Sequence, residues 1–369
     1  MVLGSMSFRQ LLDDDLASTV LPADKLLDRL NDECEHPKKA AFIFANRMEV
    51  FRERAITVYI DGFRIMAQNR CRIRRTLCHL VADWDILQLD AEELDVELRE
   101  HTVEAPLLVP SVDRRPMYSF PLSSWAYFHK LKFMAIIVQM GFELEIYQPD
   151  EICGMYFYLQ YLCQRRIKHI ERMNAFVKNP RRPIDDPAGQ KSHALAILET
   201  AAMEAEGCSK LADGLSCLYA ALTRVGLLKI PKRPYSDDRK RYEVRMKPFI
   251  RLSLPEPIPF ETFKENVEQR DLSTANILKY GDAAIKDARK VFDKLSKRDA
   301  KAAGCEGVED EWRSNVKDTM KACIFASVAI SALIKALAAN DGSIDKLKMT
   351  IPETGQGYHD WWVVPKISS

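Results

Sequence analysis

The residues of this sequence best suited to chemistry are cations gathered near helix ends and in loops. They lie at the end of an aromatic-rich segment, in the proline-bearing stretch after it, and in a later basic stretch: Arg165, Arg166, Lys178, Arg181, Arg182, Lys229, Lys232 and Arg233. Flexible cations at such places bind phosphate groups, and each contact makes the affinity depend on salt. The pattern is typical of a ribosome or RNA contact. The alternative is a solvated helix face whose cations pair with nearby Asp and Glu.

The last of these basic groups, which begins at Lys229, continues with Arg239, Lys240 and Arg241, and these have the same two interpretations. The formal net charge of the whole chain is only +1, so no overall field draws it towards nucleic acid or anionic lipid. Any basic surface must therefore be local, and we expect neither DNA nor a membrane as a partner.

Recognised catalytic motifs are missing from the sequence. It has no GxxxxGK[ST] phosphate loop, no strand-associated GxGxxG, no GxSxG elbow and no HExxH helix. The acetyl-CoA loop of acetyltransferases, an Arg or Gln followed two residues later by Gly-x-Gly or Gly-x-Ala, is not found either. We therefore expect no catalytic residues and no cofactor.

The nine cysteines are scattered without a CxxC pair, and several occupy apolar helical positions. Cysteines in that pattern act as small hydrophobic residues and stay reduced, as is typical of a cytoplasmic protein. A zinc site needs Cys or His ligands clustered at short spacing, so we expect no bound metal.

Helices are predicted almost everywhere, and they must position the cations described above. A short helix is expected over 22–30, and a long one from 38 towards 88 that continues to about 101. A third begins with a cap at Ser123 or Ser124 and ends at Gly141, which we expect to be a left-handed cap. Pro149, Asp150 and Glu151 then restart the chain as the aromatic-rich helix.

Further helices are predicted over 188–227, 273–301 and 308–340. Gly207 and Gly214 mark a kink or a second start in the first of these. Four prolines, Pro248, Pro255, Pro257 and Pro259, forbid a regular helix before Phe260. The stretch ACIFASVAISALIKALAA resembles a membrane span, but its Ala, Ser and Lys content favours a buried core helix. In the tail, Trp361 and Trp362 are expected to pack internally or to mark a partner surface.

The predicted fold class is all-α: an elongated multi-helix scaffold with long antiparallel helices and proline-rich connecting segments. We expect residues 1–5 to be a cloning remnant and 6–105 to form an amino-terminal helical region with a long helix. Residues 106–234 are expected to form a central bundle with the aromatic-rich helix, and 106–121 a loop. The remaining residues, 235–369, are expected to combine a proline-rich segment with helices.

Three segments together resemble a known family. They read RRTLCHLVADWDILQ, FHKLKFMAIIVQMGFELEIYQPDEICGMYFYLQYL and RYEVRMKPFIRLSLPEPIPFETFKE, in this order. The chain from about Phe8 onward is similar to the carboxy-terminal half of the auxiliary (Mak-type) subunit of NatC, a cytosolic amino-terminal acetyltransferase. The most specific positions belong to the GFELEIY corner and the RYE…PF…PFxxFK sequence: Gly141, Phe142, Glu143, Tyr147, Arg241, Tyr242, Glu243, Pro248, Phe249, Phe260, Phe263 and Lys264.

The resemblance implies a noncatalytic helical scaffold that binds a separate GNAT-fold catalytic subunit and a small Sm-like subunit and helps to bring them to the ribosome. The complex would acetylate nascent chains that begin with Met followed by a bulky apolar residue. Family members are considerably longer, and the half that this chain lacks carries a MDPKMD-like segment and is expected to contact the catalytic subunit. An independent helical adaptor for RNA or the ribosome is the alternative function.

Overall fold

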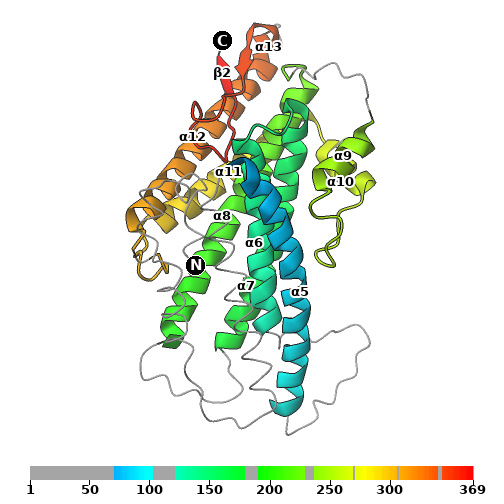
Figure 1. The fold of residues 1–369 in the computed structure, drawn as a ribbon. Coiled ribbons are helices and arrows are strands. Elements are labelled where there is room, and N and C mark those ends of the chain that lie inside the picture. The colour runs from blue at the N-terminus through cyan, green and yellow to red at the C-terminus, as the bar shows by residue number, and fades with distance from the viewer. Residues whose placement is uncertain are drawn as a thin grey trace. The chain divides into compact units, whose positions relative to one another are not determined.

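A computed structural model describes residues 70–102, 121–178, 190–228, 237–268, 271–305, 307–339 and 343–368 (Figure 1). The elements in these ranges, in chain order, are α5 (Arg70–Thr102), α6 (Pro121–Glu143), η2 (Pro149–Glu151), α7 (Ile152–Lys178), α8 (Gln190–Arg224), α9 (Asp238–Met246), α10 (Phe260–Glu268), α11 (Thr274–Ser296), α12 (Glu309–Ala339), α13 (Ser343–Lys346), β1 (Lys348–Thr350) and β2 (Lys366–Ser368). The predicted all-α class is confirmed, since the described β structure is one antiparallel strand pair. The helix predicted over 22–30 and most of that over 38–88 lie outside the described residues. So does the loop predicted over 106–121, except Pro121, which is the first residue of α6.

The chain divides into two compact units that are not consecutive in sequence. One contains Met1–Phe133 and Lys168–Leu198, and the other contains Met134–Ile167 and Glu199–Ser369. The boundaries fall within helices α6, α7 and α8 rather than at the proline-bearing breaks between the expected regions. Helices α6, α7 and α8 therefore each contribute to two packed groups.

In the first unit, α5 packs against the first half of α6 through buried polar contacts as well as apolar ones. The indole Nε1 of Trp84 donates to the carbonyl oxygen of Ala126 at 2.7 Å. Lys130 is fully buried and its Nζ pairs with Asp85 and donates to Gln88 Oε1 at 2.9 Å. Burial lowers the pKa of Lys130, while its partner Asp85 favours the charged form. These partners fix the register of the two helices.

Helix α6 begins at Pro121, so the predicted cap at Ser123 or Ser124 is wrong. The backbone N–H groups of Leu122 and Ser123 donate instead to the Asp95 carboxylate of α5, at 3.2 and 2.8 Å. These are among the donors that a helix start leaves without an intrahelical partner. A side chain from another helix therefore does the work expected of a local cap.

In the second unit, close backbone approach joins α7, α8 and α11. Cys153 Sγ donates to the Ser216 carbonyl at 3.2 Å, and Ser216 Oγ donates back to the Cys153 carbonyl at 3.1 Å. A kink or a second start was predicted at Gly207 and Gly214; helix α8 runs through both as one helix, so the second start is wrong. A Cβ on Gly214 would come within 2.8 Å of the Gly281 carbonyl oxygen, and this glycine therefore serves packing against α11.

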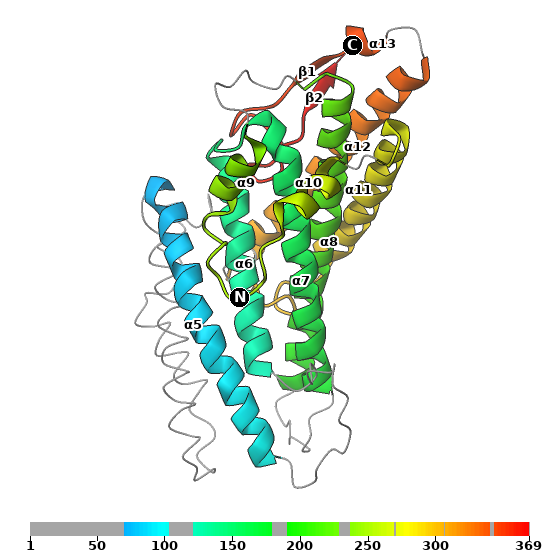
Figure 2. The same cartoon turned by 90° about the vertical axis from the view of Figure 1, so that its right-hand side faces the viewer.

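Helices α11 and α12 lie side by side in both views (Figures 1 and 2). Helix α11 begins where predicted, with Ser273 as its cap accepting from the N–H of Asn276 at 3.3 Å, but it ends at Ser296 rather than at the predicted 301. Helix α12 matches its expected range, and among the described helices it is the one long and apolar enough to cross a membrane. Its Trp312, Ala326 and Leu333 are buried in the bundle, as a core helix requires. The opposite face is exposed, so the helix is only half buried.

The carboxy-terminal tail packs internally, which was one of its two expected roles. Trp361 and Trp362 are buried, and the Trp362 ring stacks on Tyr156 of α7 with centroids 6.0 Å apart. Tyr156 Oη accepts from the N–H of Val363 at 2.7 Å. Strands β1 and β2 then pair Met349 with Ile367.

Candidate functional site

Helix α6 ends at a corner whose geometry depends on Gly141. The helix runs on to Glu143, and the left-handed residue is Glu145, with φ 52°, so the predicted left-handed cap at Gly141 is wrong. A Cβ on Gly141 would lie 2.1 Å from Cζ of Tyr147. The Tyr147 hydroxyl donates to the Val138 carbonyl at 3.0 Å, which holds the ring across this turn of α6. Gly141 is needed because an aromatic ring occupies the space of its side chain.

The predicted restart at Pro149 is confirmed, with a short 3₁₀ turn, η2, leading into α7. The Glu151 carboxylate accepts from the backbone N–H of Gln148 at 2.9 Å. Acidic residues at a helix start interact favourably with the helix dipole. The η2 turn that leads into α7 thus presents the neighbouring carboxylates of Asp150 and Glu151.

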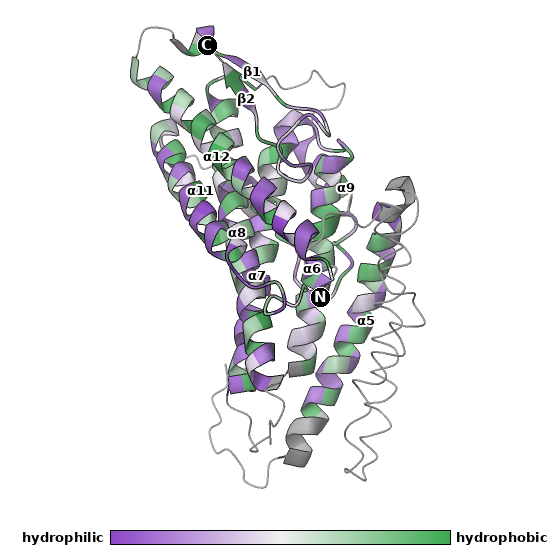
Figure 3. Cartoon of the chain, turned by 90° about the vertical axis from the view of Figure 1, so that its left-hand side faces the viewer, coloured by the Kyte–Doolittle hydropathy of each residue, from purple (hydrophilic) through white to green (hydrophobic). Residues whose placement is uncertain are grey.

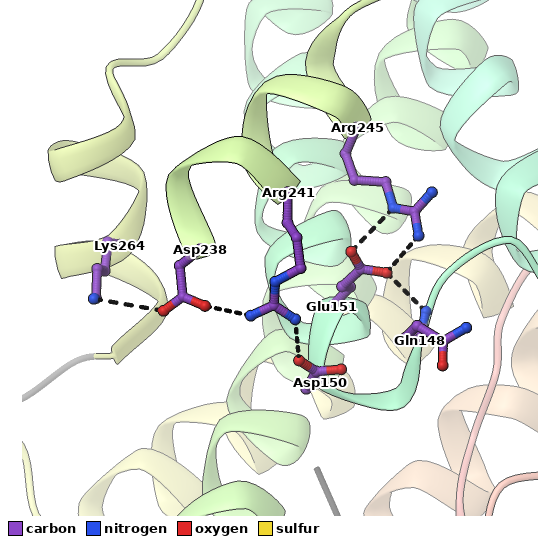
Figure 4. Close-up of polar contacts among 7 residues, drawn as sticks. All are labelled: Gln148, Asp150, Glu151, Asp238, Arg241, Arg245 and Lys264. Atoms are coloured by element: carbon purple, nitrogen blue, oxygen red, sulfur yellow. Dashed lines mark hydrogen bonds and ion pairs between the residues drawn. The ribbon is translucent and has the colours of Figure 1, made fainter. Parts of the chain in front are cut away.

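Two arginines of α9 bind these carboxylates (Figure 4). Arg241 Nη1 donates to Asp150 Oδ2 at 2.8 Å, and its Nη2 pairs with Asp238. Arg245, one helical turn later, donates from Nε to Glu151 Oε1 at 3.0 Å and from Nη2 to Oε2 at 2.8 Å. Both pairs are partly buried, with the side chains of Arg241 and Asp150 29% and 10% exposed. The two-point contact of Arg245 with Glu151 fixes orientation more strongly than a surface ion pair does.

Aromatic contacts complete the attachment of the α9–α10 segment to α7. Phe263 lies against Gly154, where an added Cβ would come within 2.4 Å of its ring, and against Phe157 at 5.8 Å between centroids. Phe249 is buried beside Tyr158, with centroids 5.6 Å apart. Tyr242 packs on Phe263 at 4.7 Å. We call residues 141–154 together with 238–264 the corner junction.

The corner junction also holds the carboxy-terminal tail. Glu143 is buried, and its Oε2 accepts from Trp361 Nε1 at 3.1 Å. Its carbonyl oxygen accepts from the Thr354 hydroxyl at 2.7 Å, and Glu145 Oε1 accepts from the Thr354 N–H at 2.8 Å. Between corner and tail lies a hollow of about 260 Å³, with Phe142, Tyr147 and His359 in its lining.

The family-pattern residues have three different roles in this arrangement. Gly141, Phe142, Glu143 and Tyr147 build the corner. Arg241, Tyr242, Phe249, Phe260, Phe263 and Lys264 belong to the attached segment, with Lys264 Nζ 3.7 Å from Asp238. Glu243 is exposed, and Pro248 is part of the turn that ends α9. The structure thus brings together two motifs that lie far apart in sequence.

The chemistry available at the corner junction is that of a structural joint. Burial raises the pKa of the Cys153 thiol to about 11, which keeps it protonated. Burial lowers the pKa of His359 to about 4, and its Nδ1 accepts from the Trp361 N–H at 3.0 Å. No group of three or more potential metal ligands gathers within the described part of the chain.

The cations proposed for RNA contact differ in their surroundings. Arg165 is exposed and lies 5.1 Å from the centre of the Tyr161 ring, and Lys178 is exposed at the end of α7. Arg166 is only 3% exposed, so it does not belong to an exposed basic surface. Arg181, Arg182, Lys229, Lys232 and Arg233 lie outside the described residues.

Arg239, Lys240 and Arg241 follow the ion-pair interpretation. Arg239 pairs with Glu261, and Arg241 pairs with Asp150 and Asp238. Lys240 is exposed, 3.7 Å from Asp237. Arg245 is the residue that sequence reasoning missed. Its spacing of four from Arg241, opposite two adjacent acidic residues, is a signal that could have identified it.

Comparisons with known proteins agree with the family resemblance. The family model described as "NAA35-like, TPR repeats" matches residues 1–365. The chain is 24% identical over 298 residues to "N-alpha-acetyltransferase 35, NatC auxiliary subunit homolog" of Drosophila melanogaster, covering 72% of this chain and 37% of that protein. It is 24% identical over 226 residues to the human "N-alpha-acetyltransferase 35, NatC auxiliary subunit", covering 59% of this chain and 30% of that protein. The matches thus span little more than a third of the relatives.

The fold recurs in crystal structures of NatC. A chain of "the NatC complex bound to CoA" matches 94% of this chain with 50% of its own length, at a TM-score of 0.70 and 16% identity. A chain of "the apo NatC complex" matches with the same score and coverage. The family model spans nearly the whole sequence and the helical fold is shared, so the chain belongs to the NAA35-like family.

Proposed function

We propose that this chain is a noncatalytic scaffold of a NatC-type amino-terminal acetyltransferase in the cytoplasm. It holds a separate GNAT-fold catalytic subunit and a small Sm-like subunit. The assembly acetylates nascent chains that begin with Met followed by a bulky apolar residue. One observation carries the proposal: the two sequence motifs shared with the family form a single packed junction, through Arg241–Asp150 and Arg245–Glu151.

The chemistry of the junction supports a scaffold rather than an enzyme. Its ionisable groups are engaged in helix starts, ion pairs and attachment of the tail, as Glu151 and Glu143 illustrate. A catalytic site instead needs a nucleophile or base within reach of a bound substrate. Rigid helices joined at such a corner are suited to present surfaces to partner proteins.

The proposal is tested by mixing the chain with the catalytic and small subunits. We expect one shared peak in size-exclusion chromatography with light scattering, and acetyl transfer to a peptide beginning Met-Leu. The chain alone is expected to transfer no acetyl group. Separate peaks, even with the remaining part of a longer relative supplied in trans, would count against the scaffold role.

A pair of variants links assembly to the corner junction. Arg241→Glu with Arg245→Glu places like charges opposite Asp150 and Glu151, and we expect the shared peak to weaken. Lys240→Glu with Lys247→Glu makes the same change of charge at exposed positions of the same segment and is the matched control. If both double variants form the shared peak equally well, assembly does not depend on the corner junction.

Ribosome anchoring is the second role that we propose, supported by the exposed cations Arg165 and Lys178 of α7. Ribosomal RNA presents phosphates that such cations bind in a salt-dependent way. In a ribosome-pelleting assay at low salt, charge reversal of both residues is expected to reduce the bound fraction. A second variant reverses the charges of Arg181, Arg182, Lys232 and Arg233 and is tested in the same assay.

The matched control for anchoring reverses Lys286 and Lys290, exposed on α11. These substitutions change the net charge equally but lie on a helix with alternating acidic residues. If neither the α7 variant nor the second variant changes the fraction bound to ribosomes, the anchoring role is wrong. An RNA adaptor that works without NatC would instead pellet with ribosomes and show no shared peak with the other subunits.

A further inference from the structure

One side of α12 is exposed along most of its length. Its residues recur at alternating spacings of four and three, and all are exposed: Lys317, Lys321, Ile324, Val328, Ser331, Lys335 and Ala338. We call these residues the outer stripe. Spacing of this kind keeps side chains on one side of a helix and is the pattern by which two helices pack together. The stripe therefore has the geometry of a helix-packing seam.

The middle of the outer stripe is apolar. Val328 is 59% exposed, and Ile324 and the adjacent Phe325 are each 37% exposed. Apolar residues recur along α12 in Figure 3. The Phe325 ring stacks on Tyr358 of the tail, with centroids 3.5 Å apart, so the tail fixes one edge of this apolar patch. Apolar side chains grouped in this way mark a protein contact more often than solitary exposed ones do.

The two ends of the stripe are cationic. Lys321 pairs with Asp318 at 2.8 Å, but no described residue pairs with Lys317 at one end or Lys335 at the other. Ser331 and Ala338 are small, which lets another backbone approach closely. A complementary surface would have carboxylates at both ends and aliphatic residues between them.

We propose that the outer stripe docks an amphipathic helix of a partner protein, with aliphatic residues at spacings of three and four between acidic ends. The inference names a docking surface for a partner and so rests on the proposed scaffold role. A helix fits better than a membrane surface because the apolar patch is short and Ser331 and Lys335 interrupt it. Since α12 is packed on its other face, the stripe is ordered before binding.

The test uses the full chain and two labelled synthetic helical peptides of equal length. Both carry the same leucine and alanine seam, one with glutamates and the other with lysines at its ends. In fluorescence anisotropy we expect the glutamate peptide to bind about ten-fold more tightly or better. Val328→Asp should weaken that binding by about ten-fold or more, because it buries a carboxylate against the aliphatic seam.

The matched control is Val244→Asp on α9, where the wild-type valine is 65% exposed. It adds the same charge away from the outer stripe, and we expect unchanged binding. Circular dichroism establishes that both variants fold. Equal binding of the two peptides, or no loss with Val328→Asp, would overturn the proposal. The proposal would also be overturned if the chain floats with phosphatidylserine-containing vesicles and Val328→Asp abolishes this binding. That result would assign the outer stripe to a membrane.

The two proposals fail separately. Suppose the chain shares a chromatographic peak with the NatC subunits, but binds both peptides equally and loses no binding with Val328→Asp. Then only the docking surface is wrong. If the glutamate peptide binds through Val328 but no shared peak forms, the docking surface stands and the NatC scaffold role is wrong.

Discussion

Arg245 binds Glu151 through two parallel hydrogen bonds, although 94 residues separate them in sequence. The same Glu151 carboxylate also accepts from the N–H of Gln148 at the start of η2. One side chain therefore stabilises a helix start and attaches α9 to it. This coupling explains why the restart after the corner and the α9 segment act as one structural unit.

Arg245→Lys is expected to destabilise the chain although the charge is kept. Lysine presents a single ammonium group and cannot reproduce the fork, so we expect a loss of about 1 to 2 kcal/mol in the free energy of unfolding. Chemical denaturation of Arg245→Lys, Glu151→Gln and the double variant measures the coupling. Lys247→Ala, at an exposed position, is the control and should change stability little. Additive effects of the two substitutions would show that the pair does not couple.

Gly141→Ala is expected to destabilise the corner by about 1 to 3 kcal/mol, because the new methyl group meets the Tyr147 ring. Tyr147→Leu should partly rescue it by removing the ring. Thermal unfolding measures both effects. Gly357→Ala is the control, since its nearest neighbouring atom lies 3.6 Å from the added Cβ. Equal effects of the two alanine substitutions would contradict the steric explanation.

Local signals predicted much of the helical fold. Pro149 with two acidic residues indicated the start of the aromatic helix. Four prolines predicted the gap between Pro248 and Phe260, but helix α9, Asp238–Met246, extends into the stretch from Tyr242 where no regular helix was expected. Each of these signals works because it acts on the backbone within one turn of its own position.

The errors arose where a distant segment supplies what a local residue was expected to supply. Asp95 receives the N–H groups at the start of α6, which made the serine cap unnecessary. Tyr147 returns over Gly141, so the glycine serves close packing rather than a left-handed turn. The corner junction was likewise not predictable as a site, because charge patterns alone do not distinguish Arg241 in an ion pair from a phosphate-binding arginine.

Trp362→Ala is expected to loosen the tail from α7. The tryptophan is 2% exposed and stacks on Tyr156, and removing a buried large aromatic side chain costs about 3 to 5 kcal/mol. Limited proteolysis should then cleave within residues 351–368 before the helices are cut. Tyr280→Ala removes an exposed aromatic residue from α11 and should leave the tail protected. A tail that stays protected in Trp362→Ala would mean that Glu143 and Thr354 hold it without the tryptophan.

His359 should make stability depend on acidity. Burial lowers its pKa from an ordinary 6.5 to about 4, with Asp360 and Asp318 opposing the shift. Between these values the unfolded chain binds the proton more readily, so this contribution to stability is present above pH 6.5 and is lost as the pH falls towards 4.

His359→Asn keeps an acceptor for the Trp361 N–H but cannot titrate. We expect the melting temperature of the variant to fall less than that of wild type between pH 7.5 and 5, by a margin of roughly a few degrees. His193→Asn, at an exposed position of α8, is the control and should follow wild type. Parallel melting curves for wild type and His359→Asn across this range would show that His359 does not bind the proton on unfolding.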